Sequence, residues 1–253
     1  MPNIRLIARL DVKAPHLIKG IHLEGVRKVG DPQTYAQRYY QAGIDEIIYI
    51  DAVASLYDRN TIVDLVRETA HNVFVPITVG GGIRSVEDAT ELLRAGADKI
   101  AINTAATKDP ELITKIAERF GAQCVVLSIQ AKRRPDGGWE ALRDSGREHT
   151  YMDVIEWAVK GQKLGAGEIL LVSVDQEGTC KGFDVELTKA VSHRVSIPVI
   201  ASGGMGEAED LMAVIEQGDC DAVAMAHVLH YEEIDLRDLR RSVLEAGIKV
   251  RKL

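Results

Sequence analysis

The feature that most constrains the fold is a regular alternation of short apolar runs with longer amphipathic segments along the 253-residue chain. The apolar runs are rich in β-branched residues and lack strict polar alternation, which is typical of parallel strands covered on both faces. We predict strands at 4–10, 46–51, 74–79, 98–103, 124–129, 168–174, 198–202 and 221–225. Eight strands alternating with about eight helices favour a TIM (β/α)8 barrel. No Gly-x-Gly-x-x-Gly follows the first strand, which disfavours an open dinucleotide-binding sheet.

Capping residues mark the expected helix ends. The Asp-Pro pairs at 31–32 and 109–110 each place a capping side chain before a proline at the first helical position, and Ser85 with Asp88 matches a capping box. The segment 130–150 is predicted to be a long loop containing a hairpin turn. Glycines expected just past helix ends are Gly43, Gly96, Gly121, Gly165 and Gly218.

A weaker signal is an internal repeat of about half the chain length. Glu46 and Glu168, which each begin an apolar run, lie 122 residues apart, and so do Gly81 and Gly203 in two glycine clusters. A repeat of this period predicts two fused half-barrels within one domain. The single domain is expected to cover 1–253, with halves at about 1–121 and 122–253.

Composition and charge exclude several classes of function. The formal net charge of -7 argues against a nucleic-acid or anionic-membrane binder, because such proteins need a basic surface. No apolar run approaches the roughly 20 residues that span a bilayer, and the N-terminus has no signal-peptide pattern. We therefore expect a cytoplasmic protein. Cys124, Cys180 and Cys220 lie outside any Cys-x-x-Cys spacing, so we expect no disulfide framework, no metal site and no cofactor.

In a barrel of this kind, functional residues lie in the loops that follow the strands. Two glycine clusters occupy such positions, where backbone N–H groups can approach phosphate oxygens. Their half-chain spacing places them on opposite sides of the barrel mouth, which suits a substrate with a phosphate at each end. The alternative is that these glycines only form tight turns. The first cluster is Gly80, Gly81 and Gly82 with Asn103 and Thr104, and the second is Gly203 and Gly204 with residues 226–227.

Asp11, at the end of the first strand, is the best candidate for general acid–base catalysis. The alternative is an ion pair with Lys13 or Lys19. The equivalent position in the second half holds Gln130, and because an amide does not exchange a proton at working pH, a two-carboxylate mechanism is interrupted here. Other polar residues expected at the mouth are Lys19, Asp51, Asp175 and His227.

Motifs spread over essentially the whole chain carry a family resemblance. They include LDVK at 10–13, TVGGGIRS at 78–85, AGADK at 95–99, INTAA at 102–106, GAGEIL at 165–170 and IASGG at 200–204. Together they resemble HisF, the cyclase subunit family of imidazole glycerol phosphate synthase. The resemblance implies a duplicated half-barrel that takes ammonia from a separate glutaminase, HisH. The ammonia passes through the barrel to cyclise and cleave a bisphosphorylated ribulosyl formimino substrate.

The resemblance also implies roles for individual residues. It places the two catalytic carboxylates at Asp11 and at position 130. The implied phosphate-binding residues are Gly82, Asn103 and Thr104 on one side, and Gly178, Gly204 and positions 226–227 on the other. The implied ammonia gate at the barrel floor is Arg5, Glu46, Lys99 and Glu168, and Asp98 is implied to face the glutaminase. The alternative for this ring is an ordinary salt-bridge network. The chain has no Gly-x-Cys-x-Gly nucleophile, so ammonia has to come from a partner.

Departures from the family pattern gather at the mouth. Beside Gln130 they are Val172 in place of threonine, Glu177 in place of aspartate, His227 in place of serine, and Arg9 beside Asp11. We expect His230, three residues beyond His227, on a helix surface.

These departures, with the segments 9–13, 18–25 and 54–57, resemble a group of HisF-like proteins associated with acetamidino modification of sugars in surface polysaccharides. Our leading expectation is therefore an ammonia-delivering barrel in a heterodimer with a HisH-type glutaminase, serving a sugar amidotransferase. The alternative is the cyclase of histidine biosynthesis, which forms imidazole glycerol phosphate and AICAR. Either reading expects a phosphorylated small-molecule ligand, no nucleic acid and no membrane.

Overall fold

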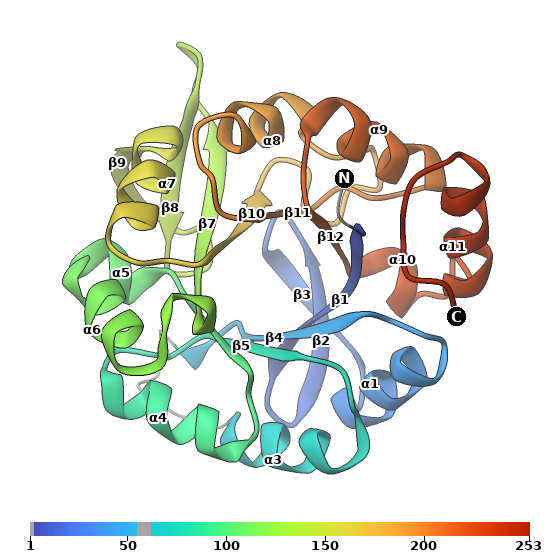
Figure 1. The fold of residues 1–253 in the computed structure, drawn as a ribbon, viewed down its shortest axis with the longest axis horizontal. Helices are drawn as coiled ribbons and strands as arrows, with labels where there is room; N and C mark the ends of the chain where they lie inside the picture. The colour runs from blue at the N-terminus through green and yellow to red at the C-terminus, as the bar shows by residue number, and fades with distance from the viewer. Residues whose placement is uncertain (1–2, 55–61) are drawn as a thin grey trace.

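A computed structural model describes residues 3–54 and 62–253 and shows a closed barrel of parallel strands (Figure 1). Residues 55–57, part of one motif discussed above, lie outside the described residues. The strands, in order around the barrel, are β1 (Arg5–Lys13), β4 (Glu46–Asp51), β5 (Ile77–Gly80), β6 (Lys99–Ile102), β7 (Val125–Arg133), β10 (Glu168–Ser173), β11 (Val199–Ser202) and β12 (Ala222–Met225). Parallel pairing of β12 with β1 closes the ring. Each predicted strand overlaps one of these, so the TIM barrel is confirmed.

Helices form an outer ring around the strands (Figure 1). They are α1 (Pro32–Gln41), α3 (Val63–Asn72), α4 (Val86–Ala95), α5 (Thr104–Lys108), α6 (Glu111–Phe120), α7 (Val154–Lys163), α8 (Val185–Ser192), α9 (Ala208–Gly218), α10 (His227–His230) and α11 (Leu236–Glu245), with a 3-10 turn η1 (Ala122–Cys124). Two of the predicted helix starts are confirmed, because Asp31 accepts a hydrogen bond from the Thr34 N–H and Ser85 forms a reciprocal capping box with Asp88.

Two predicted helix ends are displaced by one residue. Helix α6 begins after Pro110 rather than at it, although Asp109 still accepts a hydrogen bond from the Glu111 N–H at 3.2 Å. Gly218 remains inside α9, and Asp219 takes the left-handed conformation with φ of 57°. Aspartate tolerates this conformation because its short side chain can bond locally to the backbone.

Apolar side chains pack in two layers. The larger cluster lies between the barrel and the helices. A smaller cluster fills the barrel interior, with residues from seven strands: Ile7, Ile48, Ala101, Val126, Leu170, Val172, Ile200, Ala222 and Ala224. Burial of both strand faces explains why the strands read as continuous apolar runs in the sequence.

Two antiparallel hairpins extend the barrel at its mouth. The residues that follow the first barrel strand fold as β2 (His16–Ile21) and β3 (Glu24–Gly30) against β1. The segment 130–150 folds as an extended β7 followed by β8 (Trp139–Arg143) and β9 (Glu148–Asp153), so the expected loop is wrong but the hairpin turn predicted within it is confirmed between β7 and β8. The turn between β7 and β8 projects beyond the helical ring (Figure 1).

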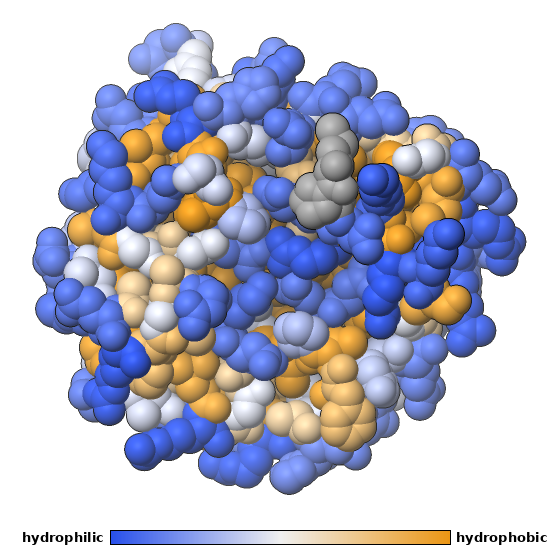
Figure 2. Space-filling model, in the orientation of Figure 1, coloured by the Kyte–Doolittle hydropathy of each residue, from blue (hydrophilic) through white to orange (hydrophobic). Residues whose placement is uncertain are grey.

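The face seen in Figure 2 has hydrophilic residues gathered at its centre, over the barrel axis, with apolar residues around them. The helices among the described residues are all too short or too polar to span a bilayer.

Candidate functional site

The barrel mouth holds a buried charge network centred on Arg9. Arg9 donates from Nε and Nη2 to the two carboxylate oxygens of Asp11, at 3.0 and 3.2 Å. Its Nη1 donates to Glu177 Oε2 at 3.3 Å and to Ser202 Oγ at 3.2 Å. The carboxylate of Asp11 therefore pairs with an arginine on its own strand, and not with one of the two lysines considered above. A bidentate pair of this kind fixes the orientation of the carboxylate.

Glu177 connects this network to the hairpin, because Lys19 of β2 donates to Glu177 Oε1. Both side chains are buried. Burial alone would raise the pKa of Glu177, but the cations of Lys19 and Arg9 outweigh burial and lower the pKa to about 2. Two cations and two carboxylates thus balance within the mouth, and Glu177 stays ionised at neutral pH.

The first glycine cluster opens into a cavity of about 360 Å³. Predicted site residues on its walls are Asp51, Gly81, Gly82, Asn103, Thr104 and Gln130. Gly81 has φ of 95°, and a Cβ there would lie 2.3 Å from the carbonyl oxygen of Asp51. Only glycine fits this close approach, so the backbone geometry requires glycine at position 81. The structure brings these residues together as expected.

The second glycine cluster surrounds a much smaller cavity of about 20 Å³. Predicted site residues on its walls are Lys19, Gly178, Gly203, Gly204 and His227. A space of this size holds about one water molecule. At Gly204 a Cβ would lie 2.0 Å from the carbonyl oxygen of Gly182, so the backbone segments are in direct contact. A phosphate needs more room than this, and a larger cavity of about 640 Å³ shares Lys19 and His227 with the small one.

Gln130 points into the first cavity and is held by its carbonyl oxygen, which accepts a hydrogen bond from the Gly146 N–H at 2.8 Å. Within the described residues its NH₂ group has no hydrogen-bond acceptor, so it can donate to a ligand. Asp175 lies outside both cavities, and its carboxylate accepts from the Arg133 N–H at 2.8 Å. Asp175 therefore supports the end of β7 and does not line the mouth cavities.

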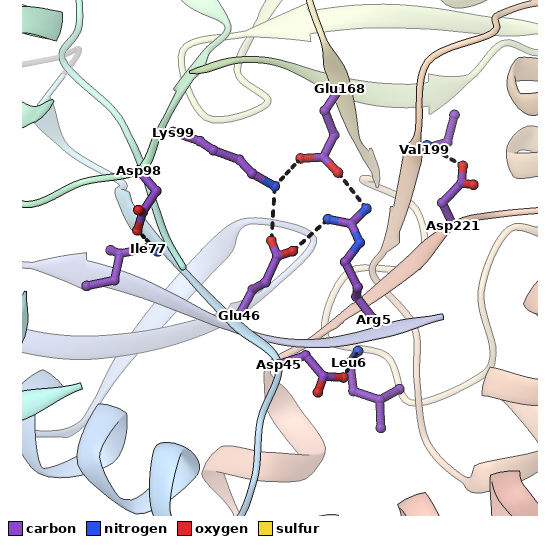
Figure 3. A network of polar contacts seen from close by, with 10 residues as sticks. All are labelled: Arg5, Leu6, Asp45, Glu46, Ile77, Asp98, Lys99, Glu168, Val199 and Asp221. Atoms are coloured by element: carbon purple, nitrogen blue, oxygen red, sulfur yellow. Dashed lines mark hydrogen bonds and ion pairs between the residues drawn. The ribbon is translucent and has the colours of Figure 1, made fainter. Parts of the chain in front are cut away.

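The barrel floor carries a closed ring of ion pairs (Figure 3). Its members, Arg5, Glu46, Lys99 and Glu168, are the first residues of β1, β4, β6 and β10. Arg5 bonds to Glu46 at 2.8 Å and to Glu168 at 2.6 Å. Lys99 completes the ring with distances of 3.2 Å to Glu46 and 2.8 Å to Glu168. Because every cation contacts both carboxylates, the four side chains close the strand ends across the barrel axis.

Aspartates beside this ring join neighbouring strands in both halves (Figure 3). Asp98, which is exposed, accepts a hydrogen bond from the Ile77 N–H at 2.8 Å. Asp221 accepts from the Val199 N–H at 2.9 Å in the matching position between β12 and β11. Each half of the chain therefore has an aspartate that accepts a hydrogen bond from the backbone of the neighbouring strand, as expected for a duplicated half-barrel.

The two histidines of α10 differ in their surroundings. His230 is 2% exposed, so the expected surface position is wrong. Its Nδ1 lies 2.7 Å from the Tyr39 hydroxyl, and burial, with Lys19 and Arg38 nearby, lowers the pKa of His230 to about 3. His227 faces the mouth and forms, with Cys180 and Glu233, a group of side chains that could hold a metal ion.

Sequence reasoning identified most residues at the mouth but missed their pairing. The contact between Arg9 and Asp11 could have been predicted, because residues i and i+2 of a strand share one face. The contacts of Glu177 could not, since 168 positions separate it from Arg9 and 158 from Lys19. Only closure of the barrel brings these three side chains together.

Comparison with known proteins gives consistent matches. A family model described as histidine biosynthesis protein matches residues 5–235. The imidazole glycerol phosphate synthase subunit HisF of Legionella pneumophila is 68% identical over 210 residues, which is 83% of this chain and 99% of that protein. The subunits HisF of Corynebacterium diphtheriae and Corynebacterium glutamicum (strain R) are 48% and 46% identical, each over 98% of both chains.

These matches correct the leading expectation from the sequence. The sugar-modification role is wrong, because relatives up to 68% identical carry the name of imidazole glycerol phosphate synthase. The departures at positions 130 and 227 do not by themselves mark a separate group, since single side chains at a mouth can change within one family. The chain belongs to the HisF family.

Proposed function

We propose that this chain is the cyclase subunit of an imidazole glycerol phosphate synthase. It would combine ammonia with a bisphosphorylated formimino ribulotide and release imidazole glycerol phosphate and AICAR. The observation that carries the proposal is the 68% identity to a protein named as this subunit over 83% of the chain. The arrangement of the barrel mouth and floor gives physical support.

The two glycine clusters support binding of a substrate with two phosphates. They lie on β5 and β11, which are opposite each other in the eight-strand ring, so a ligand that reaches both must cross the mouth. Backbone N–H groups in glycine loops bind phosphate oxygens without a side chain in the way. The first site has a cavity of about 360 Å³, whereas the second has one of about 20 Å³ beside a larger cavity of about 640 Å³ that shares Lys19 and His227.

Asp11 supports proton transfer in the cyclisation, which we assign to it as general acid and base. Arg9 holds both of its oxygens, so the carboxylate is oriented before substrate binds. Gln130 stands across the barrel on β7, where it would donate a hydrogen bond to the substrate instead of exchanging a proton. The mechanism then relies on one carboxylate for proton transfer.

The floor ring supports ammonia delivery from a glutaminase partner. The formal charges of its two cations and two carboxylates cancel, and it closes the strand ends opposite the mouth. Opening one pair would admit a small neutral molecule to the barrel interior. The exposed carboxylate of Asp98 lies beside this ring, which places it where a HisH-type subunit would dock.

The proposed activity can be tested without any partner. The purified chain is mixed with the formimino ribulotide and an ammonium salt, and imidazole glycerol phosphate is measured by mass spectrometry. We expect ammonium-dependent product. Substrate that binds but is never converted, at any ammonium concentration, would sink the proposal.

A further inference from the structure

Three side chains of metal-ligating types meet beside the second glycine cluster, and one of them, His227, also lines the small cavity of that cluster. Cys180 lies in the loop after β10, His227 begins α10, and Glu233 follows α10. One potential ligand atom from each lies within 4.8 Å of the other two. The fold brings these residues together from two separate loops, which the spacing of the cysteines could not indicate.

The geometry of one pair already fits a metal. His227 Nε2 lies 3.4 Å from Glu233 Oε1, longer than the roughly 2.7–2.9 Å of a charge-assisted hydrogen bond. Nitrogen and oxygen ligands bound at about 2.0–2.2 Å to a tetrahedral zinc ion are about 3.4 Å apart. The thiol of Cys180 is within 4.8 Å of both ligand atoms, and rotation of the exposed Glu233 side chain can bring its carboxylate closer to the thiol.

The two ring nitrogens of His227 lie in different surroundings. Nδ1 is buried and has no hydrogen-bond partner within the described part of the chain, whereas Nε2 lies beside the Glu233 carboxylate. A single metal ion binds one of the two nitrogens, and the position of Glu233 makes Nε2 that ligand.

We propose that Cys180, His227 and Glu233 bind one Zn²⁺ ion. A thiolate and a carboxylate supply two negative charges to balance the divalent cation, and the neutral imidazole completes a ligand set typical of zinc. Three protein ligands leave a fourth tetrahedral position, which water fills. The thiol loses its proton to solvent as the metal binds.

Zinc binding is tested on the full-length chain, stripped with a chelator, incubated with Zn²⁺ and dialysed against metal-free buffer. We expect about one retained Zn²⁺ per chain and affinity at least roughly 100-fold lower for Cys180→Ser and Glu233→Ala. Cys124→Ser is the matched control, because that thiol is also partly buried but lies outside the cluster, and it should bind zinc like the parent chain.

Cobalt gives a second readout that depends on the thiolate itself. Replacement of Zn²⁺ by Co²⁺ should produce a thiolate-to-cobalt charge-transfer band that Cys180→Ser loses and Cys124→Ser keeps. If Cys180→Ser does not fold, the exposed Glu233→Ala variant still tests the site. No retained zinc in the parent chain, or equal zinc affinity in Glu233→Ala and the parent, would overturn the proposal. Neither result bears on cyclase activity, which is measured separately.

Discussion

Asp11 carries the proton transfers of the proposed reaction, and Arg9 orients it through two hydrogen bonds of 3.0 and 3.2 Å. Asp11→Asn keeps the size of the side chain but removes the exchangeable carboxylate. We expect ammonium-dependent turnover to fall at least about 100-fold, the lower end for loss of a general acid or base. Steady-state kinetics with saturating ammonium measures this.

Asp64→Asn is the matched control for that substitution. Asp64 is an exposed carboxylate in the first turn of α3, paired only with Arg67 among the described residues, and its replacement should leave turnover unchanged. Comparable turnover of Asp11→Asn and the parent chain would show that another group transfers the proton.

His230 should make the folded state sensitive to acid. Burial, aided by Lys19 and Arg38, lowers its pKa to about 3 in the folded chain, whereas the unfolded value is about 6.5. Between these values the unfolded chain binds a proton that the folded chain does not, so the free energy of unfolding falls as pH drops below about 6.5. Between pH 8 and pH 5, protonation of this one group in the unfolded chain should lower the free energy of unfolding by about 2 kcal/mol.

Urea unfolding at several pH values checks the effect of His230. His230→Gln should flatten the dependence between pH 5 and 8, while replacement of the exposed His71 by Gln should not. Equal pH dependence in His230→Gln and the parent chain would contradict the assignment. Glu177 acts in a lower window, because its folded pKa of about 2 makes its contribution disappear as pH falls from about 4.5.

At the scale of elements, the strand starts at the floor form the ion-pair ring. Glu168→Gln removes the carboxylate that contacts both Arg5 and Lys99 and leaves those cations paired only with Glu46. With a glutaminase bound, we expect more glutamine hydrolysed per molecule of product, because ammonia leaks past an open ring. Asp238→Asn, which breaks an exposed pair with Arg241 on α11, serves as the control. An unchanged ratio in Glu168→Gln would argue for a purely structural ring.

The loop after β11 depends on a glycine at position 204. Gly204→Ala would force a Cβ to 2.0 Å from the carbonyl oxygen of Gly182 at φ of 111°. Gly247→Ala is the matched control, since Gly247 has φ of 84° but open space around it. We expect about 1 kcal/mol of lost stability in the control from backbone strain, and about 2 kcal/mol more at Gly204 from the clash. Similar urea midpoints for the two variants would contradict this loop geometry.

The barrel strands and the turn between β7 and β8 could be predicted from sequence, but the added strands of the two hairpins could not, for a physical reason. Barrel strands bury both faces and therefore read as apolar runs. Strand β3 is mostly exposed, and β9 has no fully buried residue, so their identity depends on main-chain pairing with β2 and β8. The glycine clusters were predictable because their spacing repeats. The burial of His230 was not, because a four-residue helix shows too little periodicity.

At the scale of the whole molecule, charge is distributed between two balanced networks at opposite ends of one barrel. The mouth network contains Arg9, Asp11, Lys19 and Glu177, and the floor network contains Arg5, Glu46, Lys99 and Glu168. The net charge of -7 thus says little about the site, since both networks are neutral in formal charge. The division into half-barrels at about residue 121 stays a prediction, supported by the matching aspartate contacts of Asp98 and Asp221.

Isotope competition tests the link between mouth and floor most directly. The chain, a HisH-type glutaminase and the formimino ribulotide are given glutamine labelled with ¹⁵N in its amide, together with excess unlabelled ammonium at a pH where most of it stays protonated. Mass spectrometry then measures ¹⁵N in imidazole glycerol phosphate. We expect product that is predominantly labelled, because ammonia reaches the mouth through the barrel before it mixes with solvent. Product labelled only in the proportion of the bulk ammonium pool, or no product, would contradict a barrel that both conducts ammonia and consumes it.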